Sequence, residues 1–346
     1  MLGVWRLQLL REVGRRGTIR AAAAAMSVTP SAVSQQLRIL EAEAGVPLLE
    51  PHGRRVRLTE AGEMLVRHAD AITAAIVAAE SELAATRDEI VGTLRIAAFP
   101  TAARAIVPGV IAELGRAHPH LRLMLRDLET DESLTALRLD EVDLAIVDEY
   151  DETTRVREPG IDLVHLMEDP LYVAVPPEMV RAEPELMRAE PERAGVVGAP
   201  APGPAHGRAP GTKAGARAPA PGPTAGRTVR LADLVGVPWI MDTETSNMCR
   251  AVLRHFRRAG FEPAVRSNCR DYSVIIALVE AGLGAAVLPG LALRERDVRA
   301  VVAPLDPPLG RRVLVALKPE RRAHPAVAAM LTVLRLPTGP VARENV

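Results

Sequence analysis

The segment GTIRAAAAAMSVTPSAVSQQLRILEAEAGVPLLEPHGRRVRLTEAG, residues 17–62, predicts two short helices across a tight turn, followed by a basic hairpin. The first helix is the alanine run Ile19–Met26, and Ser27-Val28 ends it. Thr29 is a candidate N-cap, because a threonine hydroxyl accepts a backbone N–H at the start of a helix. Pro30 suits the first helical turn, where its missing N–H would have no partner. We therefore expect a second helix from Pro30 onward.

The second helix has an apolar stripe and a polar edge. Val33, Leu37 and Leu40 recur four and three residues apart, which predicts one buried face. The polar residues outside that stripe are Ser31, Ser34, Gln35 and Arg38. Such side chains near the start of an exposed helix suit the major groove, where Gln can bond adenine and Arg can bond guanine or a phosphate. Taken alone, they are equally consistent with a solvated helix face.

A basic hairpin follows the second helix. Its charge favours the interpretation that the polar edge of that helix contacts DNA rather than solvent. Gly45-Val46-Pro47 ends the helix, and Pro51-His52-Gly53 supplies turn residues before the alternating stretch 55–58. The cluster expected at the hairpin tip consists of Arg54, Arg55 and Arg57. Residues 1–62 hold nine Arg and five Glu, which gives +4 in a chain whose total charge is zero. Contact with DNA phosphates is the simplest explanation of this asymmetry.

Residues 17–62 resemble the winged helix-turn-helix of LysR-type transcriptional regulators. The matching positions are, in order, Ala22-Ala23, Val28-Thr29, Ala32-Val33-Ser34, Leu40-Glu41, 45–48 and 58–62. The resemblance implies that Thr29, Pro30, the polar edge and the three hairpin arginines bind double-stranded operator DNA. Two positions depart from the family pattern: Leu49 stands where Phe is usual, and Pro51-His52 replaces a more basic pair in the wing.

From Thr59 to about Ile90 the sequence predicts one long helix with a heptad seam. The dimer seam is expected at Leu65, Ala69, Ile72, Ile76, Ala79 and Leu83. A 3.5-residue repeat predicts that the helix packs against a partner helix, and the favoured partner is the same helix of a second chain. Packing on the chain's own body is the alternative. In the resembled family this element is the dimerising linker helix, and tetramers built from dimers are typical.

Beyond Gly92, strand and helix signals alternate. Strands are expected at 93–99, 121–125 and 142–147, with helices at 102–117 and 131–139 between them. This order predicts a parallel sheet covered by helices, which is an α/β domain.

Loops at the carboxyl ends of such strands bind small molecules, because helix N-termini point N–H donors outward there. The loops begin at Pro100-Thr101, Glu129-Thr130 and Asp148-Glu149-Tyr150. In the resembled family the effector pocket lies between two subdomains, and Ser or Thr is common at the positions matching Thr101 and Thr130. The alternative is that both threonines are helix N-caps, each contributing about 1 kcal/mol. Asp148-Glu149 is interpreted first as a solvated acidic loop and second as a ligand contact.

A second subdomain begins where 171–175 crosses over, and it resumes at Val229 with a short strand at 239–241. A polar loop then opens a helix running to about residue 259. The side chains expected to face the effector are Thr243, Thr245, Ser246 and Tyr272, in addition to Pro100, Thr101, Thr130 and Asp148. The string GLGAAVLP at 282–289 resembles the family's return strand into the first subdomain. It is not a dinucleotide fingerprint, because its glycines follow a helix and open a strand. A strand at 313–317 and a helix at 325–336 complete the domain.

Residues 181–227 do not fit the family pattern. Of these 47 residues, 12 are Ala, 9 are Pro and 8 are Gly, and these types cannot build a core. We interpret the stretch as a disordered surface insert, with an auxiliary DNA or protein contact as the less favoured alternative. Cys249 and Cys269 are interpreted as unreactive thiols, with a redox pair as the less favoured alternative.

The predicted architecture is an N-terminal winged helix-turn-helix, a long linker helix and a two-subdomain, periplasmic-binding-protein-like effector domain. The domain limits are 1–62, 63–92, 93–172 with 285–337 (subdomain I), 173–284 (subdomain II) and a tail at 338–346. The expected function is ligand-responsive, LysR-type control of transcription in the cytoplasm, with no membrane span, metal, cofactor or enzymatic activity. The alternatives are a solute-binding protein, which would lack residues 17–62, and an enzyme with an appended DNA-binding domain, for which no catalytic constellation is found.

Overall fold

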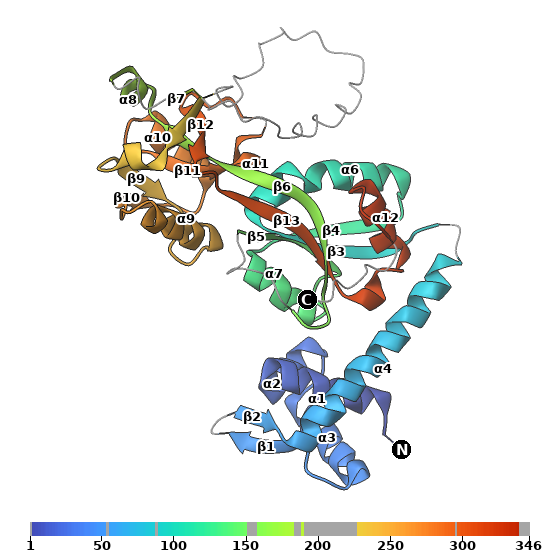
Figure 1. Cartoon of the computed structure of the whole chain (residues 1–346). Coiled ribbons are helices and arrows are strands. Elements are labelled where there is room, and N and C mark those ends of the chain that lie inside the picture. The colour runs from blue at the N-terminus through green and yellow to red at the C-terminus, as the bar shows by residue number, and fades with distance from the viewer. Residues whose placement is uncertain are drawn as a thin grey trace. The chain divides into compact units, whose positions relative to one another are not determined.

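The computed structural model describes residues 2–52, 55–86, 89–150, 158–182, 188–189, 227–294 and 296–338 (Figure 1). The chain divides into two compact units. Unit 1 holds 1–147, 158–166 and 314–346, and unit 2 holds 148–157 and 167–313. Strands β6 (Asp162–Val175) and β13 (Gly310–Leu317) each have residues in both units.

The N-terminal part of unit 1 is a winged helix-turn-helix. It consists of α1 (Val4–Arg16), α2 (Ile19–Ala25), α3 (Pro30–Ala44) and the antiparallel hairpin β1 (Leu49–His52) and β2 (Arg55–Leu58). Its core joins the apolar faces of the three helices to Leu48. The sequence predictions began at residue 17 and therefore did not cover α1.

A glycine fixes the next junction. A Cβ atom on Gly62 would lie 2.1 Å from the carbonyl oxygen of Leu48, closer than any side chain could approach. The motif Leu58-Thr59-Glu60-Ala61-Gly62 thus lets α4 (Glu60–Ala85) start directly against the wing, with the Thr59 hydroxyl accepting the Gly62 N–H at 3.0 Å.

The linker helix α4 is shorter than predicted. It ends at Ala85 with Thr86 as its C-cap, so the expectation that it continues to Ile90 is wrong. The Thr86 hydroxyl donates to the Leu83 carbonyl at 2.8 Å, a local bond that satisfies the last turn. The β-branched pair Ile90-Val91 then precedes the first strand of the sheet.

The expected heptad seam of α4 divides into two parts. Leu65 and Ala69 already pack in the core of the winged helix-turn-helix. Ile72, Ile76 and Leu83 are exposed by 37%, 38% and 68%, and Ala79 is also exposed. Another stretch of the helix packs on the 3₁₀ helix η4 (Pro319–Arg321) and on α12 (Pro325–Val333), so packing on the chain's own body occurs as well.

The α/β part of unit 1 contains the predicted parallel strands. β3 (Gly92–Ala98) lies between β4 (Leu121–Asp127) and β5 (Leu144–Glu149), parallel to both, and the strand order continues to β13 and β6. The single helix expected at 102–117 is instead two helices, α5 (Pro100–Ala105) and α6 (Val107–Ala117). Pro108 explains the break, because it has no N–H for the carbonyl one turn earlier. α7 (Thr130–Arg138) follows β4.

Unit 2 is built on the strand order β6-β12-β8-β7, and β11 (Ala286–Pro289) also pairs with β6. β12 is Val301–Asp306, β8 is Arg227–Arg230 and β7 is Arg188–Ala189. A second, parallel pair joins β9 (Pro238–Met241) to β10 (Ala264–Asn268). The remaining helices are α8 (Pro177–Ala182), η3 (Leu231–Leu234), α9 (Asn247–Arg258), α10 (Tyr272–Glu280) and α11 (Gly290–Leu293).

The insert prediction for 181–227 is wrong at its margins. Residues 181–182 end α8, and Arg188–Ala189 pairs antiparallel with β8. Residues 183–187 and 190–226 lie outside the described part of the chain. A strand forms at the expected place as β11, but it pairs with β6 inside unit 2, so the expectation that it returns to the first subdomain is wrong. Gly284 has a positive φ of 155° that brings its backbone against the Pro238 carbonyl.

Candidate functional site

The recognition-helix candidate α3 starts as the sequence predicts. Thr29 has extended backbone, and its hydroxyl accepts the Ala32 N–H at 3.2 Å, with Pro30 in the first turn. Gly45 ends the helix in the left-handed conformation. Val33, Leu37 and Leu40 are 0%, 3% and 0% exposed, so the apolar stripe is fully buried. These contacts hold α3 rigidly on the winged-helix core.

The polar edge of α3 faces away from that core. Ser31, Gln35 and Arg38 are exposed, and Ser34 is half-buried with its hydroxyl donating to the Pro30 carbonyl at 2.9 Å. The Ser31 hydroxyl lies 3.0 Å from that of Thr29. Gln35 and Arg38 make no side-chain hydrogen bond or ion pair with any described residue. Their amide and guanidinium groups are therefore available to an external partner.

The wing differs from its prediction. Pro51 and His52 are not turn residues but belong to β1, where they pair with Val56 and Arg55. The sequence places the turn too early, because a Pro-His pair followed by Gly is compatible both with a turn and with the end of an edge strand. Residues 53–54, and thus Arg54, lie outside the described residues.

The two described wing arginines are not equivalent. Arg57 bonds the carboxylate of Glu50, its neighbour across the hairpin, with its Nε 2.8 Å from Oε1. Arg55 is exposed and pairs with no acid in the described chain. Arg55 is therefore the better placed of the two for a phosphate.

The effector candidates of unit 1 lie where parallel strands end. Pro100 and Thr101 begin α5 after β3, and Thr130 begins α7 after the neighbouring β4. The N-cap alternative for both threonines is wrong. Phe99 is the N-cap of α5, and Glu129 caps α7 in a reciprocal capping box with Glu132. Thr101 and Thr130 are only 4% and 2% exposed, inside the first turns of their helices.

Asp148 belongs to a buried charge cluster of unit 2, so its interpretation as part of a solvated loop is wrong. Arg311 on β13 donates from Nη1 to Asp148 at 2.9 Å and from Nε to Asp169 on β6 at 2.9 Å. The Tyr150 hydroxyl donates to Asp148 at 3.1 Å, and the Arg311 guanidinium lies 5.9 Å from the centre of the Tyr150 ring. Arg311, Asp148 and Asp169 are 3%, 7% and 2% exposed. Glu149, also buried, pairs with Arg312 at 2.9 Å.

A second hydroxyl cluster of unit 2 surrounds Asp242. The Tyr272 hydroxyl donates to Asp242 at 3.2 Å, and Thr243 and Ser246 also bond this carboxylate. Ser246 in addition caps α9 by accepting the Cys249 N–H at 2.9 Å. Thr245 is exposed and contributes its carbonyl to Arg250. The structure thus groups Thr243, Ser246 and Tyr272 and leaves Thr245 outside the group.

Burial governs the ionisation of both clusters. It raises the pKa values of Tyr150 and Tyr272 well above the usual tyrosine range, so both hydroxyls keep their protons. Burial also raises the pKa of Asp242, although its hydrogen-bond donors act in the opposite direction. The chemistry presented here is that of neutral hydroxyl donors beside carboxylate acceptors, which suits recognition of a polar small molecule.

The sequence did not single out Arg311, Asp169 or Asp242 as site residues, and it named Tyr150 only as part of a loop. A charged residue at the start of an apolar strand usually faces solvent, so Arg311 gives no local signal of its burial. Only its acidic partners, 142 and 163 residues earlier, reveal that it is buried. No group of three or more His, Cys, Asp or Glu in the described chain could hold a metal ion. None of the described helices is both long and apolar enough to cross a membrane.

Two family profiles match the chain. "Bacterial regulatory helix-turn-helix protein, lysR family" matches residues 5–63, and "LysR substrate binding domain" matches residues 87–200 and 218–336. The second match omits residues 201–217, which lie in the stretch interpreted as an insert.

Individual relatives agree with these profiles. A protein of Mycobacterium xenopi described as a probable hydrogen peroxide-inducible genes activator is 33% identical over 171 residues, 49% of this chain and 88% of that protein. The transcriptional dual regulator GltC of Bacillus subtilis is 26% identical over 323 residues, 91% of this chain and 90% of GltC. Full-length OxyR from Pseudomonas aeruginosa, in a variant form, has the same fold at a TM-score of 0.63 and 19% identity, with 97% of this chain and 95% of that one covered.

The capped α3 with its polar edge, the adjoining wing and the two profile matches agree along most of the chain. The chain therefore belongs to the LysR family of DNA-binding, ligand-responsive transcriptional regulators.

Proposed function

We propose that this regulator reads its operator with the outer edge of α3, through Ser31, Ser34, Gln35 and Arg38, and holds the phosphates with Arg55 of the wing. The observation that carries the proposal is the contrast between the two faces of α3. One face is buried, whereas Gln35 and Arg38 are exposed without partners among the described residues. A helix fixed by one face and polar on the other matches the docking geometry of helix-turn-helix proteins in the major groove.

Replacing Gln35 by Ala tests this assignment. The ratio of affinities for operator and random DNA should fall by about 5- to 150-fold, because a lost bidentate base contact costs about 1–3 kcal/mol. The operator is the duplex that the wild type selects from a random-sequence pool. Gln36→Ala is the matched control, since Gln36 is half-buried beside the stripe. An unchanged ratio in Gln35→Ala would exclude base reading by this residue.

We infer that the effector is a polar small molecule and that two sets of groups are the candidates to bind it. Thr101 and Thr130, with Pro100, form the first set, and Asp148, Thr243, Ser246 and Tyr272 form the second. Helix N-termini add N–H donors at α5 and α7. A thermal-shift screen of metabolites tests this, because a ligand that binds only the folded protein raises its melting temperature. Thr130→Val should abolish the shift of any hit that uses the first set.

We also propose that two chains pair through α4. The exposed stripe Ile72, Ile76, Ala79 and Leu83 supports this pairing. A charge in such an apolar seam is costly to bury, so Ile76→Asp should lower the dimer fraction in sedimentation experiments. Arg67→Asp, an exposed position outside the stripe, is the control. We assign the chain no catalytic role, as its relatives are regulators, and place its action in the cytoplasm, with the DNA it binds.

A further inference from the structure

The arginines of α1 are committed to acids rather than to DNA. Residues 1–62 carry an excess of positive charge, which the sequence alone assigns to phosphate contact. Arg11, Arg15 and Arg16 instead face carboxylates that lie on α4 and beyond it in the α/β part of unit 1. Three of the nine arginines are therefore used for contacts with α4 and with the α/β part of unit 1.

Asp140 is the centre of that contact. It follows α7 with a positive φ of 56°, and its Oδ2 accepts Arg11 Nη2 at 2.6 Å and Arg15 Nη1 at 3.1 Å. Its Oδ1 bonds the ammonium group of Lys318, just past β13. Burial alone would raise the pKa of Asp140, but Lys318, Arg11 and Arg15 together lower it to about 2. The carboxylate is thus charged throughout the neutral range.

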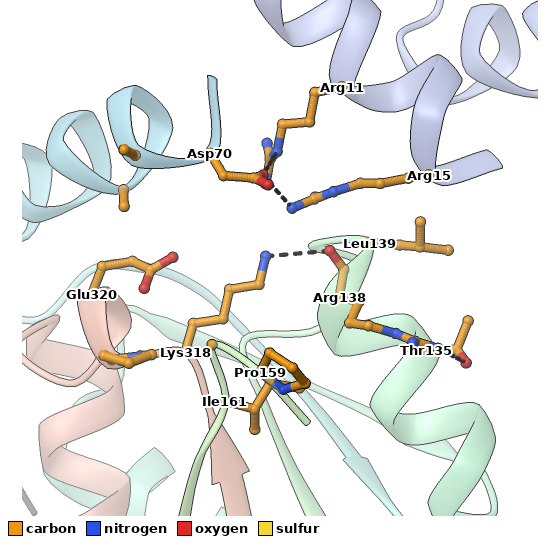
Figure 2. Close-up of a pocket in the computed structure, with 14 residues that line it drawn as sticks. Arg11, Arg15, Asp70, Thr135, Arg138, Leu139, Pro159, Ile161, Lys318 and Glu320 are labelled. Atoms are coloured by element: carbon orange, nitrogen blue, oxygen red, sulfur yellow. Dashed lines mark hydrogen bonds and ion pairs between the residues drawn. The ribbon is translucent and has the colours of Figure 1, made fainter. Parts of the chain in front are cut away.

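Two further carboxylates extend the contact. Asp70 on α4 accepts Arg11 Nε at 2.7 Å and Arg15 Nη2 at 2.8 Å. Glu141 accepts Arg16 at 3.3 and 3.4 Å and Arg126 of β4 at 2.9 Å. We name the set of Arg11, Arg15 and Arg16 with Asp140 and Glu141 the α1–α7 latch. The latch borders a cavity of about 600 Å³ that Arg138 and Lys318 also line (Figure 2), so dissolved ions have access to it.

The latch joins two functional ends of unit 1. On one side, Leu10 and Val13 of α1 pack in the same core as Val33 of α3, so α1 moves with the recognition helix. On the other side, α7 begins at Thr130 and ends immediately before the latch. If α7 moves as a rigid body, a displacement at its first residue also displaces Asp140, which lies two residues past its end.

We propose that the α1–α7 latch is an electrostatic coupling that fixes the winged helix-turn-helix on the α/β part of unit 1 and is released or reset when α7 moves. The effect of the latch on DNA binding rests on the proposed function, whereas the contact between its residues does not. Charge-assisted, multiply bonded pairs of this kind are stronger than single surface pairs, and they weaken with salt where ions can enter. The latch therefore sets how freely the recognition helix changes its pose.

Asp140→Asn with Glu141→Gln removes both negative charges of the latch with little change of shape, and asparagine tolerates the positive φ of Asp140. Glu158→Gln is the matched control, because Glu158 pairs with Arg138 at 3.5 Å beside the same cavity but bonds nothing on α1. Melting curves confirm that all variants fold. Should the double variant unfold, Asp140→Asn alone serves in its place.

The readout is the distance between spin labels at Ala24 of α2 and Ala112 of α6, which are both exposed. The labels are attached to full-length chains in which both native cysteines are replaced. Unlabelled chains are added in excess, so that the distance is measured within one chain. Wild type and Glu158→Gln should give one narrow distance distribution at low salt, and the latch variant a broadened or shifted one. A wild-type distribution in the latch variant would overturn the proposal.

The consequence for DNA is measured separately. The wild type should bind the duplex that it selects better than the same half-sites moved apart by half a helical turn, and the latch variant should lose most of this discrimination. If the wild type selects no sequence at all, the proposed function fails, while the distance measurement still decides whether the latch exists. If the wild type discriminates and the latch variant discriminates equally well, the coupling role is refuted.

Discussion

At the residue scale, Arg311 carries the largest expected effect on stability. It is 3% exposed and bonds Asp148 and Asp169 at 2.9 Å each. Replacing it by Met keeps the apolar stem but leaves two buried carboxylates without their cation. Breaking such a buried pair from one side costs about 3–5 kcal/mol, so Arg311→Met should lower the free energy of unfolding by about that amount in urea titrations.

A surface arginine of the same unit provides the comparison. Arg230 pairs with Asp233 at 3.1 Å, and its side chain is 45% exposed. Arg230→Met should leave the free energy of unfolding nearly unchanged, since water already solvates the Arg230 guanidinium. Equal losses in the two variants would mean that the Arg311 cluster is not the buried network described above.

The two cysteines differ in expected reactivity. Burial and the nearby Asp242 and Glu244 raise the pKa of Cys249 from its ordinary value of 9.0 to about 11, and its side chain is buried. Because the thiolate is the nucleophile, two pKa units reduce its reactive fraction about 100-fold near pH 8. Iodoacetamide should therefore modify Cys269, which is half-buried, well before Cys249, as mass spectrometry can follow. Labelling of Cys249 at the rate of Cys269 would revive the redox interpretation.

At the scale of elements, the residues of α3 were sufficient to predict this helix from the sequence. Elements that depend on partners distant in the sequence could not be predicted in this way. The Thr29 cap, the Gly45 end and the Val33-Leu37-Leu40 stripe follow from neighbours within one helix, and all three are confirmed. β10 was missed because its residues are mostly exposed and show no alternation, and its pairing with β9 spans more than 20 residues. Likewise, the sequence could not show that Phe99 and Glu129, rather than Thr101 and Thr130, occupy the N-cap positions of α5 and α7.

The wing yields a prediction that the sequence alone could not make. Arg57 is occupied by Glu50, whereas Arg55 has no described acidic partner. Each phosphate contact adds about one unit to the slope of log affinity against log salt concentration. Arg55→Ala should therefore flatten that slope by about one unit, and Arg57→Ala should change it less. Equal changes would show that Arg57 leaves Glu50 when DNA binds, and an unchanged slope in Arg55→Ala would exclude Arg55 from the interface.

At the scale of the whole molecule, the order of domains could be predicted because each domain has its own local signature. The helix-turn-helix has caps and stripes, α4 has a heptad repeat, and the α/β domain has alternating strands and helices. The contacts between these parts could not be predicted. The α1–α7 latch joins residues 125 and 129 positions apart in the sequence, and no periodicity connects them.

The stretch 201–217 is expected to be dispensable for folding. The LysR substrate-binding profile matches on both sides of it and omits it, and its residues are mostly Ala, Pro and Gly. Halving the length of a loop changes its closure free energy by only about 0.6 kcal/mol. A chain joined from Pro200 to Ala218 should therefore melt within a few degrees of the wild type and bind the selected duplex equally well.

A second deletion makes this result interpretable. Removing Arg188–Ala189 eliminates β7 and its pairing with β8, so that chain should lose stability although only two residues are gone. Thermal melts followed by circular dichroism compare the two deletions, and duplex titrations test the DNA-binding half. Loss of folded protein on removing 201–217 would mean that this stretch supports unit 2. Normal folding with weakened DNA binding would instead assign its basic residues, Arg208, Lys213 and Arg217, to an auxiliary contact with phosphates.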